Sequence, residues 1–479
     1  MTGQASRLDT AGLRMAGRQP ATPFTVMLAD GTEIQVFRLL RVLPGKRMVG
    51  EGRWHDRQVL VKLFIARHSA RHWTRERRGI EALQQAGLVT PEILQASALP
   101  GGGHILLTTY VSEAQSLAEI WAGLEHLPAG NADGLAVLSL ALRLLGRLHA
   151  AGLVQEDLHL GNFLQRGDEL FVIDGDAVRS VSPGQGVESL LASNNLAILL
   201  AQLPPSWDPC RPELLAAYVA GGGQRPADLR SLDEEVRRVR DWRLKDYLAK
   251  TIRDCSLFST ERSAFRFTAV VRSALENLQA LMAFPDAVMR EGQVFKDGGT
   301  CTVVRVTLAG RELVVKRYNL KNLGHALSRF WRPSRAWHSW REGHRLRFLD
   351  IATPAPLALI EERIGPLRRR AFLVTEYCAG SNLLTTLSPD EPPHAEMAQA
   401  LVSLFRTLYA LRISHGDLKA TNLLWDQGRI VLIDLDAMVQ HRSVRQHARA
   451  WQRDRSRLLR NWPQDSVLYQ WLEANLPPG

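Results

Sequence analysis

The sequence predicts an α+β protein made of two tandem copies of one bilobal domain, each with a small β-rich N-terminal lobe and a helical C-terminal lobe. The first observation is an internal repeat, because VQEDLHLGNFL at 154–164 resembles SHGDLKATNLL at 414–424. The second is that LFVIDGDAV at 170–178 resembles IVLIDLDAM at 430–438. The third is the spacing of these two motifs. Asp157 and Asp174 lie 17 residues apart (174 − 157), and so do Asp417 and Asp434 (434 − 417).

Upstream segments match in the same order, which indicates that a whole domain is duplicated rather than one motif. In each copy a strand pattern surrounds a lysine, and a helical pattern containing a glutamate follows it. A long amphipathic helix then precedes the repeated motif, and an apolar strand ending in aspartate follows it. The upstream matches pair VLVKLF (59–64) with LVVKRY (313–318), VTPEIL (89–94) with ATPAPL (352–357), and LLTTYV (106–111) with LVTEYC (373–378).

These matches place a first module at 22–240 and a second module at 286–479. The charged segment between them, 241–285, is expected to be a helical extension of the first module or a linker. A chain of 479 residues has room for two or three domains. Its hydrophobic content of 45% is sufficient for buried cores.

The chain carries a formal net charge of +11, which favours anionic partners such as nucleic acid, acidic lipid or a phosphorylated substrate. Charge alone also allows a basic surface with no particular partner. The sequence shows no signature of a nucleic-acid-binding domain, so nucleic acid is not expected as a partner. The four cysteines are widely spaced without a CxxC pair, which argues against a zinc site or disulfide framework and favours reduced thiols in the cytoplasm.

No stretch of the sequence reaches the ~18 uncharged apolar residues of a membrane-spanning helix. The most apolar stretch, 135–153, is interrupted by Arg143, Arg147 and His149. The N-terminal sequence MTGQASRLDTAGLRMAGRQP lacks the apolar core of a secretory signal. We therefore expect a cytoplasmic protein that is soluble or peripheral to a membrane, with no transmembrane segment.

The repeated residues are those that phosphoryl transfer requires. That reaction needs metal ions and a cation on the nucleotide phosphates and a base at the acceptor hydroxyl. The strand lysine would hold the α- and β-phosphates, and the helix glutamate would pair with this lysine. The loop aspartate would accept the hydroxyl proton, while the asparagine and the strand-end aspartate would ligate Mg²⁺ through oxygen. In this order, the residues are Lys62 or Lys316, Glu76 or Glu342, Asp157 or Asp417, Asn162 or Asn422, and Asp174 or Asp434.

Two features near this motif leave alternatives open. Asp176 and Asp436 follow the metal aspartates by two residues, and would act in catalysis, support the metal ligands or serve the structure. The glycines of LPGKRMVGEG (43–52) and KDGGTC (296–301) would cover the nucleotide phosphates or form plain hairpin turns, because neither segment is a full G-x-G-x-x-G.

HGDLKATNLL, LIDLDAM and the closing RSRLLRNWP (455–463) resemble the lipopolysaccharide kinase family (Kdo/WaaP, InaA-like). The resemblance covers most of the second module and, more faintly, the first. It implies protein-kinase-like folds, ATP and Mg²⁺ as cofactors, and a heptose or Kdo hydroxyl of the lipopolysaccharide inner core as acceptor. QEDLHLGN in the first module also resembles the Asp-x-His form of small-molecule kinases such as aminoglycoside phosphotransferases.

The two modules depart differently from the kinase pattern. Gln155 stands in the first module where the second has His415, two residues before the loop aspartate. In kinases this histidine supports the metal-binding segment, so the first module is expected to be the impaired copy. Neither module shows the A-P-E sequence that ends the activation segment of protein kinases. We therefore expect a sugar or lipid-linked acceptor rather than a folded protein.

An arginine- and tryptophan-rich segment, SRFWRPSRAWHSWREGHRLR (328–347), would contact lipopolysaccharide or the anionic inner membrane surface. The alternative is a packed helix with a solvated arginine face. Together, these features predict an ATP-dependent phosphotransferase acting on a sugar hydroxyl of the lipopolysaccharide inner core. The other functions that the sequence allows are a pseudokinase-type regulatory or binding protein and a soluble small-molecule kinase.

Overall fold

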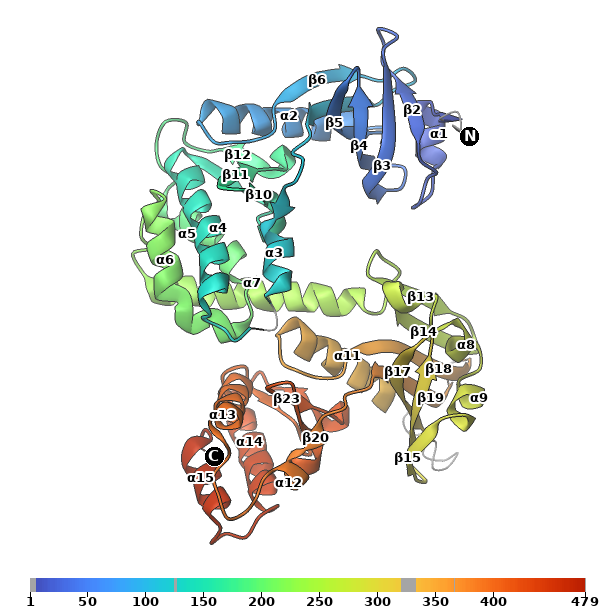
Figure 1. Cartoon of the computed structure of the whole chain (residues 1–479), viewed down its shortest axis with the longest axis vertical. Coiled ribbons are helices and arrows are strands. Elements are labelled where there is room, and N and C mark those ends of the chain that lie inside the picture. The colour runs from blue at the N-terminus through green and yellow to red at the C-terminus, as the bar shows by residue number, and fades with distance from the viewer. Residues whose placement is uncertain (1–5, 125–126, 320–332, 366, 479) are drawn as a thin grey trace. The chain divides into compact units, whose positions relative to one another are not determined.

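The chain forms two compact units, and their boundary lies within helix α7 (Leu229–Lys250). The first unit comprises Met1–Leu203 and Trp207–Arg240, and the second comprises Pro204–Ser206 and Asp241–Gly479. In Figure 1 the first unit runs from blue to green and the second continues to red. The computed structural model describes residues 6–124, 127–319, 333–365 and 367–478.

The N-terminal lobe of the first unit is a seven-stranded sheet in the order β1-β2-β3-β4-β5-β7-β6, with helix α2 beside it (Figure 1). Val59, Val61 and Leu63 of β5 are buried in the lobe core. Because side chains alternate along a strand, Lys62 faces the other side of the sheet. The elements are β1 (Ser6–Arg7), α1 (Thr10–Met15), β2 (Phe24–Met27), β3 (Glu33–Leu43), β4 (Arg47–Trp54), β5 (Arg57–Phe64), α2 (Ser69–Gln85), β6 (Ile93–Ala98) and β7 (His104–Thr109).

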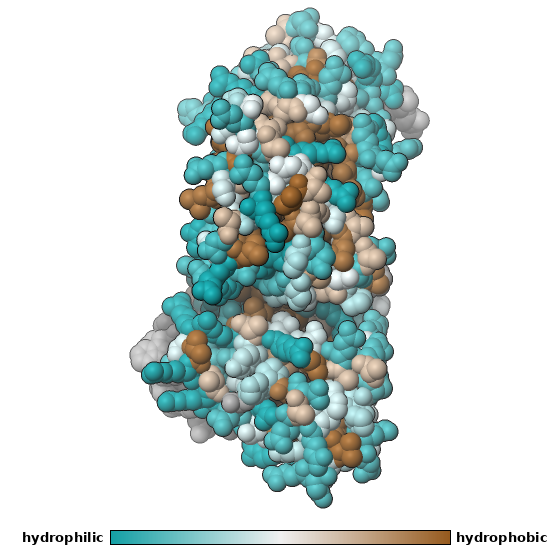
Figure 2. All heavy atoms as spheres, turned by 90° about the vertical axis from the view of Figure 1, so that its left-hand side faces the viewer, coloured by the Kyte–Doolittle hydropathy of each residue, from teal (hydrophilic) through white to brown (hydrophobic). Residues whose placement is uncertain are grey.

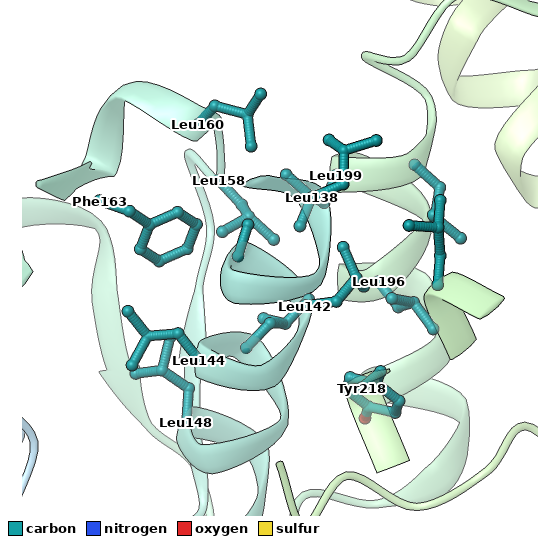
Figure 3. Close-up of a cluster of buried hydrophobic side chains, with 14 of the residues drawn as sticks. Leu138, Leu142, Leu144, Leu148, Leu158, Leu160, Phe163, Leu196, Leu199 and Tyr218 are labelled. Atoms are coloured by element: carbon teal, nitrogen blue, oxygen red, sulfur yellow. The ribbon is translucent and has the colours of Figure 1, made fainter. Parts of the chain in front are cut away.

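The C-terminal lobe of the first unit is helical around α4. Leucines recurring along α4 pack against α5 and against Tyr218 of α6 (Figure 3). Leu158 and Leu160 enter the same core, so the loop is anchored directly after Asp157. The elements are β8 (Gln115–Ser116), α3 (Leu117–Gly123), α4 (Ala132–Ala150), β9 (Leu153–Gln155), β10 (Phe163–Arg166), β11 (Glu169–Val172), β12 (Val178–Ser180), α5 (Ser189–Leu200) and α6 (Arg211–Ala220).

The second unit repeats this plan with a seven-stranded sheet in the order β13-β14-β18-β19-β17-β16-β15. Residues 241–285, expected as an extension of the first module or a linker, supply β13 and β14 and belong to this unit. The lobe elements are β13 (Phe258–Arg262), β14 (Arg266–Val271), α8 (Gln279–Ala283), α9 (Pro285–Arg290), β15 (Gln293–Asp297), β16 (Cys301–Leu308), β17 (Arg311–Tyr318), α11 (Arg335–Phe348), β18 (Pro356–Ile364) and β19 (Leu367–Glu376).

The C-terminal lobe of the second unit packs α13 and α14 around buried leucines and Trp451. Leu418 and Ala420 belong to this core and anchor the loop of Asp417, as Leu158 and Leu160 do in the first unit. The elements are β20 (Ser381–Asn382), α12 (Leu383–Thr386), α13 (Ala395–Ala410), β21 (Ile413–Ser414), β22 (Leu423–Asp426), β23 (Arg429–Leu432), β24 (Val439–Gln440), α14 (Val444–Leu459) and α15 (Val467–Asn475).

The two glycine-containing segments are hairpin turns. Residues 43–47 connect β3 to β4, and Lys46 N–H bonds to Leu43 O at 2.9 Å. In the second unit, Gly298 N–H bonds to Cys301 O at 3.2 Å in the turn from β15 to β16.

The surface is mixed in polarity. On the face drawn in Figure 2, hydrophilic side chains surround scattered apolar ones. Within the described ranges, no helix combines the length and apolar character needed to cross a membrane.

Candidate active site

In the first unit the expected lysine–glutamate pair is formed. Lys62 Nζ donates to Glu76 Oε1, and the glutamate side chain is fully buried. Glu76 also accepts the backbone N–H groups of Gly175 and Asp176, each at 3.2 Å. Helix α2 can approach this closely because Gly79 has no side chain, and a Cβ there would collide with the Gly175 carbonyl oxygen. One buried carboxylate therefore links the lysine to the segment after Asp174.

A cavity of about 300 Å³ lies beside this pair. Val49 and Leu60 of the sheet and Ile173 before the metal aspartate give it apolar walls. Lys62 and Asp174 also line it, together with residues of the connection that leaves β7. The size is at the lower end of the range of small-molecule sites.

The loop of the first unit is built differently from a standard kinase loop. Gln155 Nε2 donates to Asp174 O at 3.0 Å, so the glutamine supports the backbone at the strand-end aspartate in place of histidine. Asn162 Oδ1 accepts the His159 N–H at 2.8 Å, which directs the amide oxygen at the backbone. Asp157 is exposed, and no lysine or arginine in the described part of the chain ion-pairs with it.

In the second unit His415 supports the backbone before Asp434. Its Nε2 donates to the Ile433 carbonyl at 2.9 Å, and burial lowers the pKa of His415, so the ring is neutral. Asp434 has φ 58°, close to the 67° of Asp174, and both lie in the left-handed region. A non-glycine residue in this region is strained and needs local support. The two bonds, from His415 and from Gln155, supply that support.

The loop aspartate of the second unit is surrounded by cations. Arg457 Nη1 lies 2.5 Å from Asp417 Oδ1, and Lys419 Nζ lies 3.0 Å from Oδ2. Partial burial opposes ionisation, but Lys419 and Arg457 lower the pKa of Asp417 below its ordinary value. Asn422 Nδ2 donates to the Asp417 carbonyl at 2.8 Å and to Asp417 Oδ2 at 3.4 Å, so its amide nitrogen is held by the loop aspartate. The loop therefore holds a carboxylate with two cationic partners and an asparagine bonded to the same aspartate.

Sequence reasoning missed Asp454 of α14. This buried carboxylate accepts the N–H of His415 at 2.6 Å and the N–H of Gly416 at 3.0 Å, and so fixes the backbone before Asp417. In the first unit, Asn195 of α5 plays the same part by donating to the Gln155 carbonyl at 2.7 Å. A lone aspartate inside an arginine-rich helix gave no signal that could identify it.

The expected pair of Lys316 with Glu342 is not formed. Lys316 Nζ lies 2.6 Å from Asp434 Oδ1 and 3.0 Å from Asp436 Oδ2. Glu342 is buried and pairs with Arg345 on its own helix at 2.7 Å. The sequence assignment aligned the two helices wrongly, because any glutamate at a helical spacing fitted the pattern.

Backbone bonds after the two helices give their correct register. Leu88 N–H bonds to Leu83 O at 3.0 Å, and Ile351 N–H bonds to Leu346 O at 2.8 Å. Leu83 therefore corresponds to Leu346. Seven residues earlier on each helix, Ser339 stands where the first unit has Glu76. The second unit has no carboxylate at the position that holds the lysine in the first.

Asp436 supplies the missing carboxylate. Tyr318 OH and Ser339 Oγ each donate to Oδ1 at 2.6 Å, and Arg335 lies 2.5 Å from Oδ2. Burial alone would raise the pKa of Asp436, but Lys316 and the hydroxyl donors lower it. The sequence left catalysis, support of the metal ligands and a structural role open for Asp436, and its contacts fit a structural role in which it positions Lys316.

The arginine- and tryptophan-rich segment is largely engaged in packing where it is described. Trp340 is fully buried and donates through Nε1 to Thr251 O at 3.3 Å. Trp337 packs against Phe267 with ring centroids 5.0 Å apart. Arg335 is occupied by Asp436. Residues 328–332 lie outside the described residues.

Asn422 with Asp434, and Asn162 with Asp174, are the side chains that could hold Mg²⁺. Among the described residues, no cluster of three or more His, Cys, Asp or Glu could hold a metal ion. A magnesium site here would therefore take one carboxylate and one amide oxygen from the protein and its remaining oxygens from phosphate and water. Mg²⁺ is commonly bound in that way.

The lobed fold, the strand lysine held by a buried carboxylate, and the Asp–Asn–Asp set define the protein-kinase-like class. Residues 279–476 match the lipopolysaccharide kinase (Kdo/WaaP) family. This confirms, for that part of the chain, the family resemblance expected from the sequence.

Individual proteins show the same similarity. The lipopolysaccharide core heptose(I) kinase WaaP of Escherichia coli is 26% identical over 151 residues, which are 28% of this chain and 55% of that protein. The chain thus matches about half the length of that relative. The structure of WaaP in complex with acyl carrier protein is 17% identical with a TM-score of 0.33, covering 44% of this chain and 86% of that one. Vaccinia related kinase 3 is 12% identical with a TM-score of 0.29, over 48% and 86%.

Proposed function

We propose that the second unit is an ATP-dependent phosphotransferase that phosphorylates a sugar hydroxyl of the lipopolysaccharide inner core, either a heptose or a Kdo hydroxyl. The observation that carries this proposal is the Asp417 loop, in which an ionised carboxylate lies beside Lys419 and next to the Asn422 and Asp434 pair. The match of this region to the lipopolysaccharide kinase family supports the choice of acceptor.

Each residue of the second unit has a separate role in an in-line transfer of the γ-phosphoryl group. Asp417 accepts the proton of the acceptor hydroxyl as its oxygen attacks the γ-phosphorus and the bond to the β–γ bridging oxygen breaks. Lys316, which pairs with Asp436, would contact the α- and β-phosphates of bound ATP. Mg²⁺, when bound, neutralises phosphate charge, and Asn422 and Asp434 would hold it. Lys419 supplies a cation beside Asp417, where charge moves during transfer.

The direct test is transfer of labelled phosphate from ATP to purified core oligosaccharide that lacks phosphate. We expect label on a heptose or Kdo residue, located by mass spectrometry of the product. Label on free small sugars and none on the core would favour the small-molecule kinase instead. ATP binding without any transfer would reject the proposal.

We predict that Mg²⁺ acts through Asp434 in the second unit and, more weakly, through Asp174 in the first. Each replacement by asparagine removes one charged oxygen ligand, so the thermal stabilisation of the chain by MgATP should fall more for Asp434→Asn. Thermal-shift titrations with MgATP and with ATP in EDTA measure this. Unchanged MgATP responses in both variants would show that neither aspartate holds the metal.

We also propose that the protein is cytoplasmic and associates peripherally with anionic membranes or lipopolysaccharide. The motivation is the charge of +11 and the exposed arginines of α14, including Arg445, Arg449 and Arg453 at a spacing of four residues on one helix face. Each basic side chain near an anionic surface contributes about 1 kcal/mol, and salt screens the attraction.

The prediction is that replacing Arg445, Arg449 and Arg453 with glutamine releases the protein from anionic vesicles at low salt. Co-sedimentation at low and high salt measures this. The matched control replaces Arg57, Arg71 and Arg78, which are exposed on the first unit. Equal loss in both triple variants would indicate a non-specific charge effect, and unchanged binding would remove α14 as the contact. Arg335 is unsuitable for this test because it contacts Asp436.

A further inference from the structure

We propose that Arg457 of the second unit binds an anionic group, a carboxylate or a phosphate, on the saccharide that accepts the transferred phosphate. Arg457 is then a specificity residue, because an acceptor that carries such a group beside the reacting hydroxyl is preferred over a neutral one. This role rests on the proposed transfer to a sugar hydroxyl, and it specifies the acceptor further as an acidic saccharide.

Arg457 contacts the base through only one of its three side-chain nitrogens. Its Nη1 lies 2.5 Å from Asp417 Oδ1 and donates to the Gly416 carbonyl at 3.1 Å. Within the part of the chain that the structure describes, Nε and Nη2 have no protein partner. The side chain of Arg457 is 42% exposed, so a ligand can approach it from solvent.

The Nε–Nη2 edge of a guanidinium carries two parallel N–H groups, which match two oxygens of a carboxylate or a phosphate. A hydroxyl or ring oxygen of a neutral sugar has no charge to attract this edge. Because Nη1 is already bonded at Asp417, an anion on the other edge would lie only the width of one guanidinium from the base. The anionic group and the reacting hydroxyl would therefore belong to the same sugar or to adjacent sugars.

The charges around the base leave an excess of positive charge for such a ligand. Lys419 Nζ lies 3.0 Å from the second oxygen of the base, so two cations share one carboxylate. Arg453 and Arg460 are exposed, four residues before Arg457 and three residues after it, and so lie near it on the same side of α14. Asp454, the acidic residue of α14, is buried and occupied by backbone N–H groups, so it does not neutralise this side.

A purely structural role does not account for Arg457. Asp454 already holds the backbone before the base through two N–H groups. In the first unit Asn195 of α5 holds the corresponding backbone, and Ile198 stands three residues farther along that helix, where α14 has Arg457. The loop of Asp157 nevertheless continues into a single 3₁₀ turn at 160–162, as the loop of the second unit does at 420–422. Formation of the loop therefore does not require an arginine at this position.

Binding of the acceptor tests this role without any transfer. The full chain, with ADP in place of ATP, is titrated calorimetrically with phosphate-free core oligosaccharide and with the same oligosaccharide after reduction of its carboxylates to alcohols. We expect the carboxylate form to bind about tenfold or more tightly, because charge-assisted hydrogen bonds are lost on reduction. A third form, reduced but with a phosphate on a sugar other than the acceptor, identifies the group as phosphate if it alone binds tightly. Equal binding of all three forms, or no binding of any, would overturn the proposal.

Variants assign the preference to one side chain. In Arg457→Gln the charged and the reduced forms should bind alike, whereas Arg457→Lys keeps the charge without the paired N–H groups and should retain only part of the preference. The matched control is Arg449→Gln, which removes an exposed arginine about two turns earlier on α14 and should keep the full preference. ADP binding shows that each variant is folded. Persistence of the preference in Arg457→Gln, or equal loss in Arg449→Gln, would show that the overall charge of the chain is responsible instead.

Transfer from ATP separates this role from an effect on the base. Partial burial raises the pKa of Asp417, and Lys419 and Arg457 lower it, so loss of Arg457 changes the rate for every acceptor. The ratio of kcat/KM for the charged and the reduced acceptor cancels this common effect, and it should fall toward one in Arg457→Gln. An unchanged ratio would reject the role of Arg457 while the proposed phosphotransfer stands. Transfer to neither acceptor would reject the phosphotransfer, and the binding preference would then decide the role of Arg457 by itself.

Discussion

Replacing Asp417 with asparagine is expected to lower the rate of phosphate transfer by about 10²–10⁴-fold, the usual cost of losing a general base. The asparagine side chain fills the same space but cannot accept the hydroxyl proton. Nucleotide binding should persist, because Lys316 and Asp434 remain. The loss should therefore fall on kcat rather than on the KM for ATP.

The measurement is steady-state transfer from ATP to phosphate-free core oligosaccharide, with thermal unfolding recorded for every variant. Asp465→Asn is the matched control, because Asp465 is an exposed aspartate between α14 and α15. Near-normal turnover in Asp417→Asn would refute its role as the base. A large loss in the Asp465→Asn control would show that the assay reports on folding instead.

Replacing Asp436 with asparagine is expected to reduce kcat/KM for ATP by roughly 10–100-fold, the usual cost of losing a group that orients a ligand-binding side chain. Lys316 would keep only Asp434 as a carboxylate partner and lose its fixed position. Burial and the charge of Asp436 raise the pKa of Tyr318, so that hydroxyl remains a donor to this carboxylate. Removing the Asp436 carboxylate should also lower the melting temperature of the protein.

A rescue experiment separates positioning from simple destabilisation. In the Asp436→Asn background, Ser339→Glu places a carboxylate at the position of Glu76 in the first unit, and part of the ATP affinity should return. Glu342→Gln is the contrast, because it breaks the buried pair with Arg345 and should cost stability while the KM for ATP stays the same. If Glu342→Gln instead raised the KM for ATP and Asp436→Asn did not, the result would support the pairing of Lys316 with Glu342 that the sequence predicted.

The kinase-like architecture of both units could be predicted because the same motifs occur twice along the chain, in the same order. A repeated Asp–Asn–Asp spacing specifies a loop, a hairpin and a strand end, and the structure places both sets on those elements. The strand lysines were also predicted from the alternation of apolar residues. These signals are local, so they can be recognised in the sequence without knowledge of the fold.

The rest depended on contacts between distant segments. The choice between Glu342 and Asp436 is decided by the register of α11 against β17 and by the left-handed turn at Asp434, which no periodicity reveals. The role of Asp454 requires knowing that α14 passes behind the catalytic loop. The expectation that Gln155 marks an impaired copy rested on one substitution, yet Gln155 still supports the metal segment through its own hydrogen bond.

The extended sheet of the second unit has a consequence for any shortened form of this protein. The family match begins at residue 279, but β14 pairs along β18 from Arg266 opposite Glu362 to Val270 opposite Ala358. A fragment that begins at residue 279 would lack β14 and leave the edge of β18 exposed. Exposed strand edges pair with strands of other chains. The fragment would also uncover Trp340, which packs in one cluster with Phe258 and Phe267. A fragment of the second unit should therefore begin near Asp241, and one that begins at residue 279 is expected to be more prone to aggregate.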